Sequence, residues 1–412
     1  MPDVAAFQGF RYAPGVEPAA VTSPPYDVIS PRERAALEAA SPHNVVRLIL
    51  GPLGVSDDRK YIEARRLLDA WIDEGVLVRD DAPSLYLYEE RFEVDGERRS
   101  QVGLLAAVEI SDEVMPHERV MGPVVDDRLA VIRTTEANLS PVFCLYWSRD
   151  DAARRVIEAT MAEEPYAAFT DEGGVDHRAW RISDQERIKA VAAALAGAKT
   201  VIADGHHRYR TAEAYKEERR ADDGPGPWDR MLLYLVDAER DGPALLPIHR
   251  VVHDLAVEDA LDKLSEHFEV EEVPAADPDE LALLVNRRRA EGRSYALLGP
   301  KSSWIVTLRD EKVAAQATEG DHSDAWRDLD VAVLHSLVFE QILGGAAATY
   351  VHHPAEAEEA VQTGEATFAV LLARTPTAAV REIAEAKDSM PPKSTFFIPK
   401  PRTGIVIRSL RV

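Results

Sequence analysis

The chain has 412 residues, of which 46% are hydrophobic, and its formal net charge is −24. A chain of this length buries more than one core, so two or three domains or subdomains are expected. The strong negative charge opposes binding to nucleic acid and to anionic lipid, because phosphate neutralisation dominates such affinity. These values predict a folded protein without a nucleic-acid partner.

The single cysteine and the N-terminal sequence exclude further classes of protein. Cys144 is the only cysteine, which excludes an intrachain disulfide and a CxxC zinc or redox site, and its apolar setting "SPVFCLYW" predicts a core residue. The sequence has no basic and apolar leader pattern at its start and no 18-residue apolar run. We therefore expect a cytoplasmic protein that does not span a membrane; the sequence leaves its oligomeric state open.

The first hundred residues mix helices and strands. Helices are predicted from Pro31 to Ala40 and over 59–74, the second ending at Gly75, a typical helix stop. Two β-rich runs flank Asp95 and Gly96, the residue pair that a type I′ hairpin prefers.

The remaining elements alternate without an internal repeat. Strands are predicted at 140–147, 231–238, 245–252 and 366–374, a hairpin at 294–310, and helices at 150–164, 184–197, 258–268, 331–343 and 377–386. The fold class is therefore α+β with mixed sheets. We divide the chain into an N-terminal α+β segment (1–100), a core (101–225) and a C-terminal α+β domain (226–412).

The stretch "TVIADGHHRYRTAEAYKEERR" at 200–220 is the strongest candidate site. An apolar run ends at Asp204 and Gly205, and a helical pattern follows, so His206, His207 and Arg208 are expected at a strand-to-helix turn. A helix N-terminus has free N–H groups and a partial positive charge, and a glycine lets an anion approach them. Arginine adds a fork for phosphate. The cluster therefore predicts an anion site, although each residue alone is ordinary turn or surface chemistry.

Further clusters offer polar side chains in loops. "MPHERV" contains His117 and Glu118, "PPYDVIS" contains Tyr26 and Asp27, and "MPPKSTFFIPK" contains Lys393, Ser394 and Thr395. The last set supplies donors suited to phosphate or carboxylate beside two prolines that stiffen the backbone. Each cluster has an unremarkable interpretation as surface or turn chemistry. We predict that all of them line one cleft with residues 204–208.

These residues together resemble a known family. From "PPYDVIS" to "PKSTFFIPK" the chain resembles a large uncharacterised prokaryotic family that carries the ADGHHR motif. "ADGHHRYRTA" is similar to the phosphate-binding signature of the ParB/sulfiredoxin-like superfamily. "MPHE", "ADGHHR" and "PPKST" occur in the same order as in the ParB-like free serine kinases. The chain adds to the kinase pattern about a hundred N-terminal residues and an insertion between the HE and DGHHR motifs.

The resemblance implies a ParB/sulfiredoxin-like nucleotide-binding core and a role for each motif. It implies that Glu118 is catalytic with His117 beside it, and that Asp204 belongs to a loop that binds nucleotide phosphates and is associated with a metal. The other residues of that loop are Gly205, His206, His207 and Arg208. It further implies that the acceptor or its phosphate contacts Lys393, Ser394 and Thr395. ADP or ATP is the implied donor, and oxygen ligands such as Asp204 suit Mg²⁺.

Three functions remain open at this stage. The first is a small-molecule kinase that uses Glu118 as base and a hydroxyl-bearing amino acid as acceptor, since phosphoryl transfer needs positioning and charge neutralisation. The second is a ParB-like nucleotide switch without phosphotransfer, for which CTP is also a possible nucleotide. The third is a metal-dependent hydrolase using Asp204, His206 and His207, although the sequence has no HExxH spacing.

Overall fold

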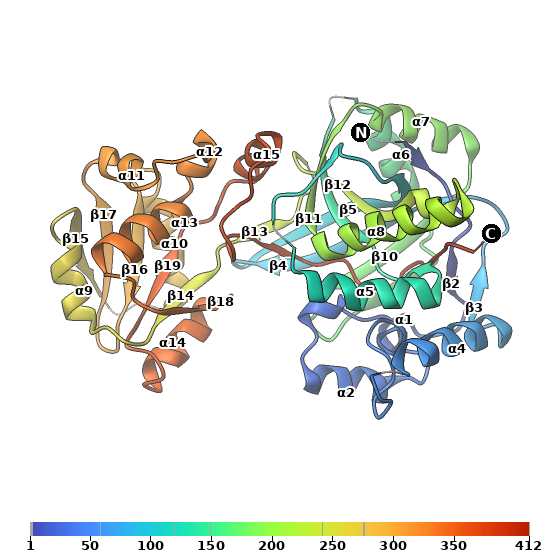
Figure 1. Ribbon diagram of the computed structural model, residues 1–412, viewed down its shortest axis with the longest axis horizontal. Coiled ribbons are helices and arrows are strands. Elements are labelled where there is room, and N and C mark those ends of the chain that lie inside the picture. The colour runs from blue at the N-terminus through green and yellow to red at the C-terminus, as the bar shows by residue number, and fades with distance from the viewer. Residues whose placement is uncertain are drawn as a thin grey trace. The chain divides into compact units, whose positions relative to one another are not determined.

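The computed structural model describes residues 3–57, 59–118, 120–148, 150–240, 242–274 and 277–411 (Figure 1). The chain forms two compact units. The first comprises Met1–Pro243 and Pro399–Val412, and the second comprises Ala244–Ile398. The second unit is thus an insertion in the first.

A large mixed sheet organises the first unit. Its strands run in the order β6 (Val114–Met115), β11 (Lys199–Asp204), β8 (Val142–Trp147), β12 (Arg230–Asp237), β5 (Glu97–Glu109), β4 (Leu85–Val94), β10 (Asp176–Ile182) and β9 (Ala167–Thr170), with β1 (Val4–Ala5) on β5. β6 pairs in parallel with β11, and β12 in parallel with β8. Two short ladders join β2 (Phe10–Tyr12) to β3 (Leu77–Arg79) and β7 (Ala137–Asn138) to β21 (Arg408–Ser409).

Helices pack on this sheet, and several short ones form the N-terminal part of the unit. They are α1 (Pro18–Val21), the 3₁₀ turn η1 (Tyr26–Val28), α2 (Pro31–Ala40), α3 (Val46–Ile49), α4 (Lys60–Asp73), α5 (Gly122–Thr135), α6 (Ala152–Met161), α7 (Gln185–Leu195), α8 (His206–Asp223) and the 3₁₀ turn η2 (Pro227–Asp229). Residues of α6, α7 and α8 share one apolar core with the sheet strands, including the fully buried Cys144. α5 packs against both α8 and α4 (Figure 1).

The second unit has its own sheet and core. Its antiparallel strands run in the order β15 (Phe268–Val273), β17 (Ser303–Leu308), β16 (Ser294–Leu298), β19 (Phe368–Leu372), β14 (His249–Val252) and β18 (Ala348–Val351), and β13 (Ala244–Leu246) pairs with β20 (Phe396–Ile398). Its helices are α9 (Val257–Leu264), α10 (Pro278–Arg288), α11 (Glu311–Ala317), α12 (Asp324–Arg327), α13 (Asp330–Val333), the π-helix η3 (Leu334–Ile342), α14 (Pro354–Gln362) and α15 (Thr377–Glu385).

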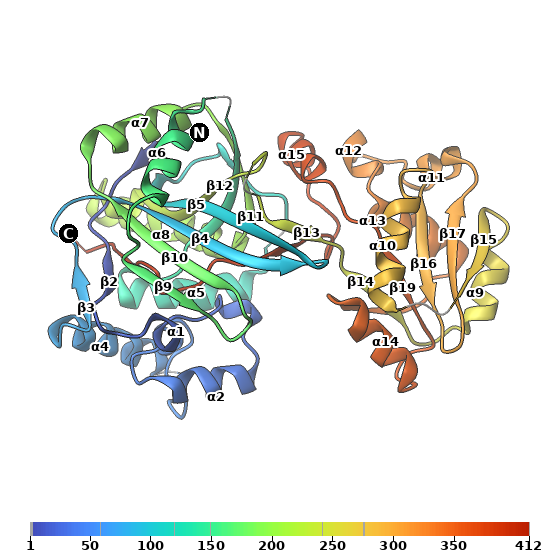
Figure 2. The same ribbon diagram turned by 180° about the vertical axis from the view of Figure 1, so that it is seen from behind.

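The predicted α+β class with mixed sheets is confirmed, but the three predicted segments do not follow the observed division. β4 and β5 pair across residue 100, and β12 joins the same sheet from beyond residue 225. The pairing at residue 100 is the predicted hairpin itself, in which Asp95 and Gly96 both have positive φ, at 55° and 73° (Figure 2). The two strands of a hairpin belong to one sheet, so the predicted boundary at residue 100 does not divide two domains.

One helix differs in type from its prediction. The run that ends at Gly344 continues from α13 as the π-helix η3. The wider turn carries His335, whose Nε2 accepts a hydrogen bond from Nη2 of the buried Arg250 at 3.0 Å. The apolar pattern of the run does not distinguish an α-helix from a π-helix.

None of the helices in the described part of the chain is long and apolar enough to cross a membrane.

The sheet of the first unit buries one carboxyl group without a cationic partner in direct contact. Glu90 on β4 is fully buried, accepts hydrogen bonds from Gln101 at 2.6 Å and Tyr88 at 3.3 Å, and burial raises its pKa to about 8. A carboxyl with a raised folded-state pKa stabilises the fold below its unfolded pKa, and this contribution is lost as pH rises through the folded pKa.

We therefore expect Glu90→Gln to reduce the loss of stability between pH 5 and 8, because glutamine mimics the protonated carboxyl. The expected difference between mutant and wild type at pH 8 is on the order of 4 kcal/mol at most, from the size of the pKa change. Urea unfolding at several pH values measures it. Glu109→Gln, at an exposed position of β5, is the control and should follow wild type; parallel pH curves for Glu90→Gln and wild type would contradict the prediction.

Candidate functional site

The site lies where two parallel neighbours of the large sheet end. Thr200 and Val201 of β11 pair with Val114 and Met115 of β6. Because parallel strands end at the same edge, the loop after β6 and the turn after β11 lie together. A bulge between Ile202 and Asp204 interrupts the pairing of β11 with β8, and such bulges re-aim the side chains that follow them.

Gly205 allows the predicted turn to form. It is the N-cap of α8 with φ of 95°, a conformation that L side chains rarely adopt. A Cβ at this position would lie 2.9 Å from the guanidinium carbon of Arg208, so a side chain would displace that guanidinium from Asp204 and from the carbonyl of Pro141. Since glycine has no side chain to cap the helix, the first N–H groups of α8 remain donors for an anion.

Both histidines of the turn hold the loop after β6. The backbone N–H of His117 donates to Nε2 of His206 at 3.3 Å, and the N–H of Met121 donates to Nε2 of His207 at 3.0 Å. An imidazole nitrogen that accepts a hydrogen bond carries no proton, so each neutral ring has its proton on Nδ1. The paired histidines therefore fix the loop that carries Glu118 against α8.

The electrostatics favour neutral imidazoles. Burial, reinforced by His117 and His207, lowers the pKa of His206 well below its ordinary value. Burial also lowers the pKa of His117 and of His207. Glu118 lies 3.8 Å from Nδ1 of His206 and 3.9 Å from Nε2 of His117, and its side chain is 38% exposed. A solvent-accessible carboxylate thus stands beside the first residue of α8.

Asp204 is held by two cations. One carboxylate oxygen contacts Arg208, and the other lies 2.6 Å from Nζ of Lys400. Burial acts to raise the pKa of Asp204, but Lys400 and Arg208 outweigh it and the pKa is lowered. Arg208 also donates to the carbonyl of Pro141, and its Nε makes no hydrogen bond with any described residue. The turn therefore contains a compensated carboxylate and one buried donor that protein atoms leave unpaired.

Lys400 is a site residue that the sequence analysis missed. Besides Asp204, its Nζ contacts Asp27 at 3.3 Å, so one ammonium joins the turn after β11 to the 3₁₀ turn η1. Burial acts to lower the pKa of Lys400, but the two carboxylates outweigh it and raise the pKa. The signal available in the sequence was the setting of Lys400 between Pro399 and Pro401, directly after the PPKST stretch.

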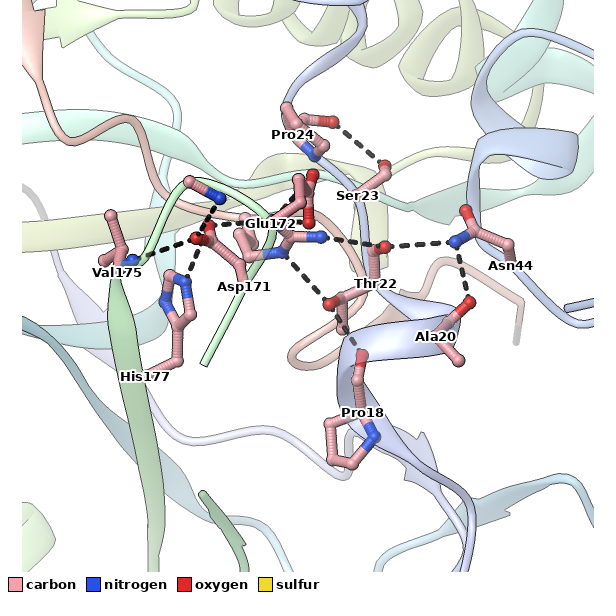
Figure 3. Close-up of polar contacts among 12 residues, drawn as sticks. Pro18, Ala20, Thr22, Ser23, Pro24, Asn44, Asp171, Glu172, Val175 and His177 are labelled. Carbon is pink, nitrogen blue, oxygen red and sulfur yellow. Dashed lines mark hydrogen bonds and ion pairs between the residues drawn. The ribbon is translucent and has the colours of Figure 1, made fainter. Parts of the chain in front are cut away.

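The segment that carries Lys400 is anchored by Arg402. This buried arginine donates to the hydroxyl and the carbonyl of Thr22, both at 3.1 Å, and to Asp171 at 2.9 Å. Figure 3 shows these acceptors with Asn44, which donates to the same Thr22 carbonyl at 3.1 Å, and with His177, whose Nε2 lies 3.0 Å from Asp171. Lys400 lies two residues before Arg402, so these contacts also fix the backbone position of Lys400.

Tyr26 and Asp27 join this cluster. The guanidinium of Arg128, on α5, lies 4.3 Å from the ring centre of Tyr26, and burial raises the pKa of the Tyr26 hydroxyl. Asp27 reaches the turn through Lys400. The structure thus brings together three of the predicted groups in the first unit: Tyr26 with Asp27, His117 with Glu118, and Asp204 with Gly205, His206, His207 and Arg208.

The fourth predicted group belongs to the second unit. The backbone of Lys393 has a positive φ of 57°, its carbonyl accepts from Arg250 at 3.1 Å, and Ser394 is buried with its hydroxyl donating to the carbonyl of Pro391. A non-glycine residue in this conformation is costly, and the surrounding contacts must hold it. A common cleft of Lys393, Ser394 and Thr395 with the residues of the first unit stays a prediction.

The expected metal role of Asp204 does not fit its surroundings. Both of its oxygens already contact cationic groups, Arg208 and Lys400. The described residues include no group of three or more His, Cys, Asp or Glu side chains that could hold a metal ion. Because Mg²⁺ in a nucleotide site takes oxygen ligands from phosphates and waters besides one or two carboxylates, it is the pairing of both Asp204 oxygens with Arg208 and Lys400 that disfavours a metal there.

Residues 4–332 match the model of a family described as a protein of unknown function, DUF1015. The chain belongs to this family. No curated protein matches the chain.

Solved structures show a distant likeness. A free serine kinase mutant in complex with AMP is 14% identical, with a TM-score of 0.37 and coverage of 71% of this chain and 87% of the kinase chain. A conserved hypothetical protein from Pyrococcus furiosus is 14% identical, with a TM-score of 0.34 and coverage of 71% and 90%. These values are too low to carry a function from those proteins to the DUF1015 chain.

Proposed function

We propose that this protein binds ADP or ATP through the first turn of α8 and transfers a phosphoryl group to the hydroxyl of a free, serine-like amino acid. One observation carries the proposal: the partly exposed carboxylate of Glu118 lies 3.8 Å from His206, the first residue of an uncapped helix. A proton acceptor beside an anion-binding turn is the pair of functions that phosphoryl transfer requires.

The residues divide the reaction between them. The acceptor hydroxyl gives its proton to Glu118 while its oxygen forms a bond to the transferred phosphorus. The bond from phosphorus to the leaving oxygen of the nucleotide breaks, and the nucleotide keeps that electron pair. The free N–H groups of α8 and the unpaired Nε of Arg208 stabilise the phosphate charge. Asp204, compensated by Lys400, fixes Arg208 in place.

The motif resemblance supports the same assignment. The order of "MPHE", "ADGHHR" and "PPKST" is similar to that of the ParB-like free serine kinases, within a ParB/sulfiredoxin-like core. It assigns the acceptor side to Lys393, Ser394 and Thr395, and the proposal includes these residues.

A nucleotide switch is the second candidate, and one observation favours it. In the loop held by the histidines, Val120 and Met121 are exposed, Met121 by 62%. Neighbouring exposed apolar side chains offer a protein partner apolar surface to contact. In this alternative, nucleotide binding at the turn moves the loop through His206 and His207 and changes its contact with a protein partner.

Incubation with nucleotides and hydroxyl-bearing metabolites separates the two candidates. The purified protein is mixed with ADP, ATP or CTP and with serine, threonine, homoserine or glycerol, and phosphorylated product is detected by mass. The kinase proposal expects product from one nucleotide and an amino-acid acceptor. Nucleotide binding without product in any combination would favour the switch.

A further inference from the structure

A cavity of about 570 Å³ lies in the first unit beside the proposed phosphate turn. Its lining comes from η1, α2, the segment after α3, the first turn of α4 and the first two turns of α5. Its apolar wall consists of Leu50, Pro52, Leu53, Val55, Pro123 and Val124. Its polar lining consists of Tyr26, Arg34, Asp57, Lys60, Asp127 and Arg128.

Two short connections join this cavity to the turn after β11. Tyr26 lines the cavity, and its neighbour Asp27 contacts Lys400, which contacts Asp204. On the other side, Pro123 lines the cavity two residues after Met121, whose N–H donates to His207. The cavity therefore approaches the N-terminus of α8 from the side of His207.

Glu118 lies at the same helix N-terminus, beside His206. Its carboxylate lies near Nδ1 of His206, and it is not among the residues that line the cavity. A phosphate on the turn would thus have the proton acceptor at His206 and the cavity at His207. Phosphoryl transfer needs the acceptor and the leaving nucleotide on opposite sides of the phosphorus.

We propose that this cavity holds the base and ribose of the nucleotide whose phosphates lie on the turn. The assignment rests on the proposed nucleotide binding and names the part of the ligand that each region takes. It also places the acceptor on the side of Glu118.

The size and chemistry of the cavity suit a nucleoside. Cofactor sites generally have volumes of about 300–1,000 Å³ with apolar walls and a few polar groups. The leucines, valines and prolines offer contact area for a flat base. The hydroxyl of Tyr26, which also lines the cavity, can exchange hydrogen bonds with ribose hydroxyls. Asp127 is ionised, since arginine and lysine contacts outweigh burial and lower its pKa to about 2, and its two oxygens already accept hydrogen bonds from Lys60, Tyr61 and Arg128. Lys60 and Arg128 surround it and give the cavity cations that attract an anionic ligand to a protein of strongly negative charge.

Filling the cavity tests the proposal. Val124→Trp introduces an indole into the first turn of α5, and Leu53→Trp introduces one at a wall residue that is 49% exposed. Affinities for ADP and for inorganic pyrophosphate are measured by calorimetry with each variant. We expect the ratio of ADP affinity to pyrophosphate affinity to fall at least tenfold in both variants, because pyrophosphate needs only the turn. Ile62→Trp, on an exposed position of α4 outside the cavity, should keep the wild-type ratio.

The outcomes separate this proposal from the kinase proposal. An unchanged ratio in both cavity variants would overturn the nucleoside assignment, even if wild type transfers phosphate. A reduced ratio in a protein that never transfers phosphate would support the assignment while removing the kinase reaction. If Val124→Trp fails to fold, as judged by circular dichroism, Leu53→Trp decides. A wild-type protein that binds pyrophosphate but gains nothing from the nucleoside would overturn the assignment as well.

Discussion

Glu118→Gln is expected to lower the rate of phosphoryl transfer by roughly 10²- to 10⁴-fold, the usual contribution of a general base. Glutamine keeps the size of the side chain and one acceptor oxygen but cannot take the proton of the acceptor hydroxyl. Nucleotide affinity should change less than about twofold, because the proposed arrangement places the phosphates on the N-terminus of α8 and not on Glu118. Single-turnover rates and calorimetry measure the two quantities separately.

The location of Glu118 makes this test specific. Its carboxylate is 38% exposed, and glutamine keeps the size of the side chain, so the substitution should leave the fold intact. Glu113→Gln, at an exposed position directly before β6, is the matched control and should transfer phosphate at the wild-type rate. Equal rates for wild type and Glu118→Gln would remove Glu118 as the base. Unchanged nucleotide-dependent behaviour in a protein without transfer would favour the switch.

Local sequence patterns predicted the elements of the site well. The apolar run stopped by Asp204 and Gly205 predicted a strand and then a helix, and the structure has β11 and α8 there. Asp95 and Gly96 predicted the hairpin of β4 and β5. These features depend on neighbours within a few residues, such as a positive φ at glycine, and so can be read from a short stretch.

Long-range contacts account for what the sequence analysis missed. Lys400 reaches Asp204 only because the chain returns to the first unit after the insertion Ala244–Ile398. The strands at both ends of that insertion, β13 and β20, have the same apolar character as strands of the first unit, so composition gives no boundary. For the same reason the anchoring of Arg402 by Asp171 could not be anticipated.

The sequence predicts that the histidines and Arg208 bind phosphate, and their burial shows that they also have a structural role. His206 and Arg208 are 5% and 7% exposed and contact protein atoms, so they support the turn besides any contact with phosphate. Arg208→Ala would consequently disturb Asp204 as well as a ligand, because a buried carboxylate would lose one of its two cations. A mutation of Lys400, the other cation at Asp204, therefore tests the charge balance there more directly.

Lys400→Met is expected to destabilise the protein by about 3 kcal/mol and to weaken nucleotide binding at least tenfold. The mutation keeps the apolar stem of the side chain but leaves the buried Asp204 with Arg208 alone and Asp27 without its ammonium. Breaking a buried ion pair from one side costs several kcal/mol, since the remaining charge stays desolvated. The surplus negative charge beside the turn also repels phosphate. Urea unfolding and calorimetry with ADP measure the two effects.

A double-mutant cycle distinguishes this charge balance from a simple loss of packing. Combining Lys400→Met with Asp204→Asn removes both charges, so the double mutant should lose less stability than the sum of the single mutants, by about 1–3 kcal/mol. Lys189→Met, which removes a lysine paired with Glu186 on the exposed face of α7, is the control and should cost less than about 0.5 kcal/mol. Additive losses in the cycle would mean that Lys400 does not compensate Asp204.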